Sequence, residues 1–161
     1  MRACSKTLAA AAAALACHLG VASAASVYTE TLKAPMPQAQ KEVQSALQSH
    51  HMKVVMTIDI LKKIKAKQKV LHMANFNQPG FTDVRAMVFC NPVLFNQLLD
   101  SDWKDAAVCP LTVTLFSKGS VTHVAFAERS AYTAGGPAQQ AGQRVDKLVI
   151  SSLKSIPGSS S

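Results

Sequence analysis

Two apolar segments joined by a short turn constrain this chain more than any other feature. Residues 111–116 and 120–127 are rich in β-branched and aromatic side chains, as strands are. The turn between them contains Lys118-Gly119. Strands joined by so short a glycine-containing turn predict an antiparallel β-hairpin.

Three further segments have the composition of strands. Residues 27–32 alternate apolar and polar side chains, and residues 52–60 and 84–89 are mainly apolar. Met52 and Met56 fall at same-face positions of their segment, which predicts that both pack in the core. Asn91-Pro92 predicts that the strand at 84–89 stops at Cys90 or just after it.

Four segments have helical features. Residues 38–50 and the C-terminal segment after Pro137 carry apolar stripes, residues 61–69 predict a short amphipathic helix, and Asn91 predicts the cap of a helix over 92–100. The two stripes consist of Ala39, Val43, Ala46 and Leu47, and of Val145, Leu148, Val149 and Leu153. Such stripes must pack on something, so we expect an α+β fold, with an antiparallel-rich sheet and helices packed on one of its faces.

The N-terminus has the three parts of an export signal. Arg2 and Lys6 precede an alanine-rich apolar stretch over 8–19, and Ala22-Ser23-Ala24 offers a cleavage site. We therefore expect a signal peptide over 1–25, a single domain over 26–157, a flexible tail over 158–161 and a periplasmic or secreted location. The alternative is a lipoprotein anchored through Cys17.

The net charge of the chain indicates which classes of partner, such as nucleic acids or membranes, it could bind. It is +8 for the whole chain, and Arg2 and Lys6 account for two of these charges, so residues 26–161 carry +6. The only cluster is formed by Lys62, Lys63, Lys65, Lys67 and Lys69, with no aromatic residue among them. This favours a solvated lysine-rich face over a nucleic-acid site, and no membrane-spanning segment is expected after cleavage.

Cys90 and Cys109 are the only cysteines that would remain after cleavage. Each borders a turn beside a predicted buried strand, so in an oxidising compartment we expect a disulfide between them. It would close a loop of about 19 residues and contribute on the order of 3 kcal/mol of stability. Unpaired buried thiols, and a reactive or metal-binding pair, remain as alternatives, although no Cys-x-x-Cys spacing is present.

Other chemistry-bearing residues lack the spacing of a known site. His50, His51, His72 and the nearby methionines could bind soft metals, but no histidine pair has the separation of a preformed site, so no metal or cofactor is expected. His123 lies near Ser120 and Thr122, yet nothing sets a nucleophile beside a base, and no catalytic residue is assigned. Asn91, Pro92, Trp103 and His123 are the candidate residues for a small-molecule pocket.

One stretch of this chain resembles a known family. Residues 84–92, Val-Arg-Ala-Met-Val-Phe-Cys-Asn-Pro, are followed by an amphipathic helix, then by Cys109-Pro110-Leu111 and the hairpin. This order resembles the family catalogued as domain of unknown function 302, with similarity from about Tyr28 to Phe126. The resemblance implies a small exported α+β domain and admits a homodimer, but it implies no reaction. Many members have glycine where this chain has Cys90.

These observations lead to two functional hypotheses. The first is an exported, non-enzymatic domain that is stabilised by a disulfide and binds a small ligand or a protein partner. The alternative is a thiol-redox or metal-handling protein that uses Cys90, Cys109 and nearby histidines.

Overall fold

A five-stranded antiparallel sheet organises the structure, a computed structural model that describes residues 26–161. The predicted signal peptide over 1–25, with the alternative lipid attachment at Cys17, lies outside these residues. In chain order the elements are β1 (Val27–Leu32), α1 (Met36–Ser49), β2 (Lys53–Asp59), α2 (Ile60–Lys67), β3 (Asp83–Cys90), α3 (Pro92–Ser101), the 3₁₀ helix η1 (Asp105–Val108), β4 (Leu111–Lys118), β5 (Val121–Ala127), α4 (Ser130–Thr133) and α5 (Gln139–Lys154).

The strands lie in the order β1-β5-β4-β3-β2, and every neighbouring pair is antiparallel. The predicted hairpin is confirmed: β4 and β5 pair up to Lys118 and Val121, and Gly119 in the turn has a φ of 65°. That positive φ suits glycine, because residues with a Cβ atom rarely adopt this left-handed backbone conformation. The sheet and its helices confirm the α+β fold class.

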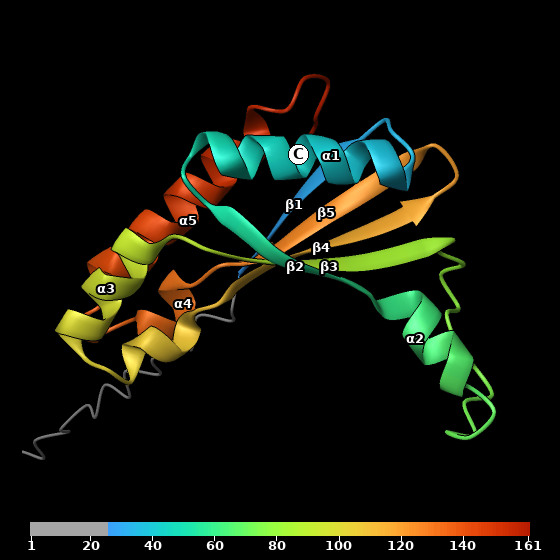
Figure 1. The fold of residues 1–161 in the computed structure, drawn as a ribbon, viewed down its shortest axis with the longest axis horizontal. Helices are drawn as coiled ribbons and strands as arrows, with labels where there is room; N and C mark the ends of the chain where they lie inside the picture. The colour runs from blue at the N-terminus through green and yellow to red at the C-terminus, as the bar shows by residue number, and fades with distance from the viewer. Residues whose placement is uncertain (1–25) are drawn as a thin grey trace, which may run out of the picture.

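Alternation along the strands divides the sheet into two faces. Leu111, Val113 and Leu115 of β4, with Val124 and Phe126 of β5, are buried on the side where α1 and α5 pack. Figure 1 shows α1 lying over this side of the sheet. We call it the core face, and we call the opposite side, which neither α1 nor α5 covers, the open face.

The predicted apolar stripes of the two long helices are confirmed. Those of α1 and α5 are buried in the same cluster as the core face, with only Leu148 partly buried. Burial of each larger aliphatic side chain in these stripes stabilises the folded protein by about 1.5–3 kcal/mol. Packing on the sheet therefore holds both helices.

A β-bulge in β2 contradicts one sequence-based expectation. Val54 pairs with Phe89, and Met56 pairs with Val88, so Val55 is an extra residue in the ladder. One inserted residue moves all following side chains to the opposite face. Met52 is fully buried as predicted, but Met56 lies on the open face and is 51% exposed.

Capping side chains define where two helices begin. The side chain of Asn91 accepts hydrogen bonds from the backbone N–H groups of Val93 and Leu94, which confirms it as the cap of α3. The Asp59 carboxylate accepts the N–H of Lys62 at 2.9 Å, so α2 begins at Ile60. Helix α1 begins two residues earlier than predicted, because Pro37 fits the first helical turn.

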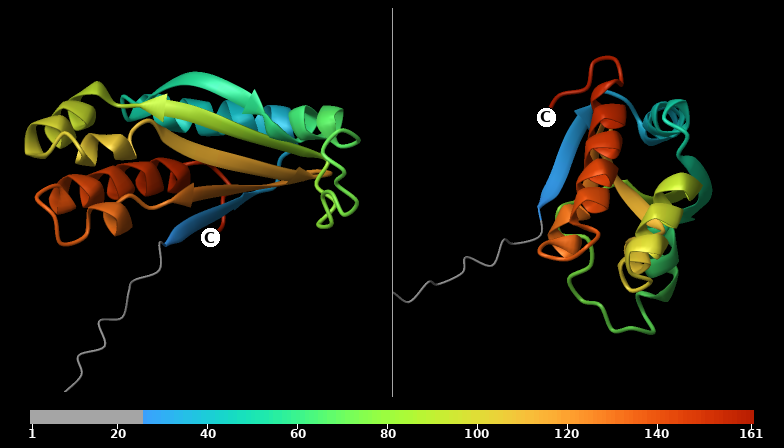
Figure 2. Two further views of the ribbon diagram at one scale, coloured as in Figure 1. Left: turned by 90° about the horizontal axis from the view of Figure 1, so that it is seen from below. Right: turned by 90° about the vertical axis from the view of Figure 1, so that its left-hand side faces the viewer.

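The elements η1, α3, α4 and the start of α5 gather at one end of the sheet (Figure 2). A second small apolar cluster holds them there, formed by Leu98, Ala106, Ala138 and Ala141. The Asp146 carboxylate of α5 also accepts the backbone N–H groups of Arg129 and Ser130 at 2.6 and 2.8 Å. We call this part of the molecule the helical end.

The C-terminal residues, for which a flexible tail is predicted, contact the outer edge of β1. The backbone N–H and C=O of Ser160 both pair with Thr31, at 3.0 and 2.8 Å. This contact covers part of one edge of the sheet. Within residues 26–161, no helix combines the length and apolar character required to cross a bilayer.

Gly142 is placed where α5 closely approaches α4. A Cβ atom at this position would lie 2.1 Å from the Thr133 hydroxyl and 3.1 Å from the Cα of Ser130. We expect Gly142→Ala to lower the free energy of unfolding by about 1–3 kcal/mol, because overpacking outweighs the higher helix propensity of alanine. Urea denaturation measures this change, and exposed Gln143→Ala is the matched control. An unchanged midpoint for Gly142→Ala would contradict the close packing of the two helices.

Candidate functional site

The four residues predicted to form a pocket are not brought together. Asn91 is buried and its side chain is used as the helix cap, whereas Trp103 is 71% exposed beyond the end of α3. Pro92 lines a cavity of about 290 Å³, but together with Gln48, His51, Met52 and Lys53. His123 lies on the open face, with its Nδ1 atom 3.0 Å from the Thr31 hydroxyl.

Strand register explains why His123 is remote from Asn91. His123 pairs with Phe116, which pairs with Val84, seven residues before Asn91 along β3. At about 3.3 Å per residue this separation is roughly 20 Å. His123 and Thr122 also point to opposite faces of the sheet, since successive strand residues alternate. The register therefore separates His123 from Thr122, and the hydroxyl that lies within hydrogen-bond reach of His123 is that of Thr31.

Cys90 and Cys109 do lie close together. Phe89 pairs with Leu111, so the last residue of β3 and the segment before β4 meet at the helical end of the sheet. Both cysteines are half-buried, and both are free thiols in this structure, which does not contain the predicted disulfide. Burial raises the pKa of the Cys109 thiol to about 11, and the neighbouring Cys90 thiol adds to the rise.

Arg129 lies beside this thiol pair. Its positive charge opposes the rise in the pKa of Cys109. The guanidinium also stacks 5.9 Å from the Phe126 ring and 5.8 Å from the Tyr132 ring, and its buried Nε atom has no hydrogen-bond partner. Sequence reasoning did not identify Arg129, because its position beside the thiols depends on strand pairing.

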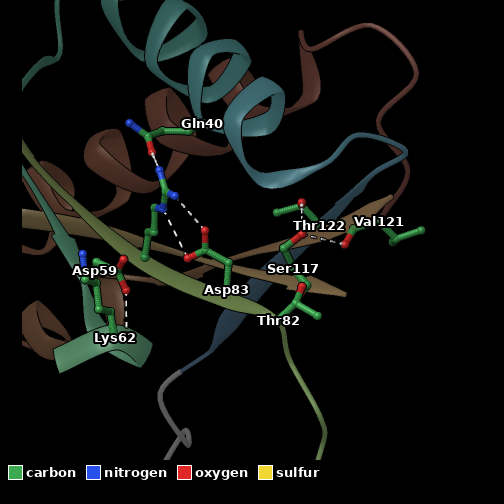
Figure 3. A network of polar contacts seen from close by, with 9 residues as sticks. Gln40, Asp59, Lys62, Thr82, Asp83, Ser117, Val121 and Thr122 are labelled. Atoms are coloured by element: carbon green, nitrogen blue, oxygen red, sulfur yellow. Dashed lines mark hydrogen bonds and ion pairs between the residues drawn. The ribbon is translucent and has the colours of Figure 1, made fainter. Parts of the chain in front are cut away.

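A polar network occupies the opposite end of the core face, where Figure 3 shows Asp83, Gln40, Ser117 and Thr122. The Arg85 guanidinium donates to both oxygens of Asp83, at 3.2 and 2.7 Å, and to the Gln40 carbonyl at 2.6 Å. The Thr122 hydroxyl donates to the Ala34 carbonyl at 2.8 Å and lies 3.1 Å from that of Ser117. Since these groups satisfy one another, the network is structural and ties α1 to the sheet.

Two further cavities are shallow and lie between helices. One of about 340 Å³ separates α3 from α5 and is lined in part by Gln97, Asp100 and Arg144. Another of about 340 Å³ lies between α1 and the end of α5, beside Lys41 and Ile156. Neither contains a residue predicted for the pocket. In the described part of the chain, no three His, Cys, Asp or Glu side chains are grouped as metal ligands.

The open face of the sheet has an unusual composition for an exposed surface. Strand register assigns to it mainly threonine, alanine and valine side chains, with Phe116, His123, Met56, Ile58 and Cys90. It carries no carboxylate, and its formal charges are Lys53 and Lys118, each at an end of its strand. A sheet face that remains in water normally carries charged side chains. The open face is therefore the best candidate for a binding surface.

The raised pKa of Cys109 predicts slow alkylation of the reduced protein. A shift from 9.0 to about 11 lowers the thiolate fraction near pH 8 about 100-fold relative to the unfolded chain. Peptide mapping after iodoacetamide treatment, with and without urea, measures the ratio at Cys109. Because the folded state retains this proton to higher pH, the contribution of Cys109 to stability falls as pH rises from about 9 toward about 11. Equal alkylation rates in the two states would contradict the buried setting.

Comparison with known proteins identifies the family. The family model "Domain of unknown function DUF302" matches residues 28–152. Among solved structures, the uncharacterized conserved protein DUF302 from Bacillus stearothermophilus is similar, with a TM-score of 0.70 and 14% sequence identity, covering 81% of this chain and 97% of that chain. No curated protein matches this chain. The family match extends the resemblance seen in the sequence through most of α5, and this chain belongs to the DUF302 family.

Proposed function

We propose that this protein is an exported, non-enzymatic module that binds a protein partner through the open face of its sheet. The observation that carries the proposal is the absence of carboxylates from that face, whose residues come from all five strands. Sheet surfaces with so few charges are typical of the central part of protein interfaces. The shallow cavities between helices give less support to a small ligand.

A second copy of this chain is the partner that best fits the face. Two sheets can pack face to face about 10 Å apart, and the small threonine and alanine side chains permit close approach. A twofold interface must be complementary to itself, and a face whose only charges, Lys53 and Lys118, lie at strand ends can meet a copy of itself without pairing like charges in its middle. Pairing through the edges is less favourable, because Ser160 covers part of β1 and a bulge interrupts β2.

A carboxylate in the middle of the open face tests this interface. Ala125 pairs with Thr114 at the centre of the sheet. We expect Ala125→Glu to weaken dimerisation at least about 100-fold, because association would bury an uncompensated charge in each copy. Sedimentation equilibrium measures the dissociation constant, and Gln143→Glu on the exposed side of α5 is the control.

Two results would contradict the interface proposal. A wild-type protein that remains monomeric at about 100 μM, where an interface of ordinary size is occupied, excludes the homodimer. Dimerisation of Ala125→Glu that equals the wild-type value excludes the open face. Circular dichroism of each variant establishes that the fold is retained.

Export and the disulfide belong to the same proposal. The N-terminal sequence supports passage to an oxidising compartment, and the proximity of Cys90 to Cys109 supports a bridge between them there. The high pKa of Cys109 favours a structural bridge over catalysis, because a protonated thiol is a poor nucleophile. The alternative, a thiol-redox or metal-handling protein, is favoured by one observation, the positive charge of Arg129 beside the thiols.

Mass spectrometry of the protein recovered from an exporting bacterial host tests these points. We expect loss of the predicted leader, a mass lower by two hydrogens and no alkylation before reduction. Cys90→Ser should then lower the free energy of unfolding by about 3 kcal/mol under oxidising conditions, and by much less under reducing conditions. A retained leader contradicts export, whereas reactive thiols or stoichiometric metal contradict the structural bridge and favour the alternative.

A further inference from the structure

The segment between β2 and β3 projects away from the rest of the molecule. It comprises residues 60–82, which we call the basic arm: α2 and the turns that lead back to β3. Figure 1 shows α2 and these turns extending beyond the end of the sheet, and the views in Figure 2 agree. The arm is thus a surface distinct from the middle of the open face.

Almost all of the net charge lies in this arm. It contains Lys62, Lys63, Lys65, Lys67 and Lys69 and no acidic residue, which gives a formal charge of +5. Residues 26–161 together carry 15 basic and 9 acidic side chains, a net charge of +6, so everything outside the arm contributes +1. All five lysine side chains are exposed.

Large apolar side chains follow the lysines directly at the outer part of the arm. Val70 is 77% exposed, Leu71 55% and Met73 36%. Exposed aliphatic groups beside concentrated positive charge are unexpected on a surface that meets only water. The same combination is characteristic of protein segments that lie in the interface of an anionic bilayer.

The arm is held in place at its base. The Thr82 hydroxyl and backbone N–H both donate to the Ser117 carbonyl, at 3.1 and 2.8 Å. The Phe81 and Phe116 rings lie 5.3 Å apart, and the Lys118 ammonium donates to the Pro79 carbonyl at 3.2 Å. These contacts anchor the base of the arm to the sheet. An arm that is already anchored loses less conformational entropy when its lysines and its exposed apolar residues, Val70, Leu71 and Met73, bind a surface.

We propose that the basic arm docks the protein on membranes that contain anionic lipids. The lysine ammonium groups contact the lipid phosphates, and Val70, Leu71 and Met73 enter the boundary between headgroups and acyl chains. A lipid surface fits better than a nucleic acid, because the lysines have no interleaved aromatic residue on which bases could stack. A lipid surface also explains why Val70, Leu71 and Met73 are exposed, because a purely ionic contact would not require apolar side chains beside the lysines.

Co-sedimentation with vesicles tests the proposal. The protein recovered from the exporting host, with the same N-terminus in every variant by intact mass, is mixed with phosphatidylcholine vesicles containing about 30% phosphatidylglycerol in about 0.1 M salt. We expect Lys63→Gln, Lys65→Gln and Lys67→Gln together to weaken binding about 100-fold. Val70→Ser with Leu71→Ser should weaken it about tenfold through lost apolar contact.

A charge-matched variant controls for nonspecific attraction. Lys33, Lys104 and Lys147 are exposed lysines outside the arm, and their joint replacement by glutamine removes the same charge. We expect this variant to bind within about threefold of wild type. Equal losses in the two triple variants, equal binding to vesicles of phosphatidylcholine alone, or unchanged binding of Val70→Ser/Leu71→Ser would each overturn the proposal. So would tighter binding to single-stranded DNA than to the anionic vesicles.

Discussion

The packing of α1 and α5 on one face of the sheet is the interaction on which the rest of this structure depends. Val43 and Leu47 of α1 and Val149 of α5 share a core with Val113 and Phe126 of the central strands. Because strand side chains alternate, filling one face with helices leaves the other without cover. The open face, the helical end and the basic arm are all positioned by this single layer of packing.

Most charged side chains of this molecule lie away from the open face of the sheet. The Arg85–Asp83 ion pair and Asp59 lie on the core-face side of their strands, and Glu30 is buried there as well. The lysines, in contrast, are concentrated in the basic arm. The open face between them is left nearly uncharged, so the fold presents two chemically different surfaces, each suited to a different class of partner.

Sequence reasoning located part of the candidate site. It predicted a disulfide between Cys90 and Cys109, because each borders a turn beside a predicted buried strand, and the structure places the two thiols side by side but unbonded. The residues predicted for a pocket lie apart, since Asn91 is used as a helix cap and His123 lies on another part of the sheet. The types of these residues suggested that they could bind a ligand, but residue type carries no information on how far apart the side chains lie in the fold.

The sequence by itself determined which elements form and which side of most of them is apolar, because hydrophobic periodicity, caps and turns are local properties. It predicted the hairpin, the Asn91 cap and the buried stripes of α1 and α5. Only the tertiary structure decided the strand order, the bulge that exposes Met56, and the position of Arg129 beside the two thiols. These depend on pairing between residues far apart in the chain, where many registers satisfy the local pattern and packing of the whole core selects one.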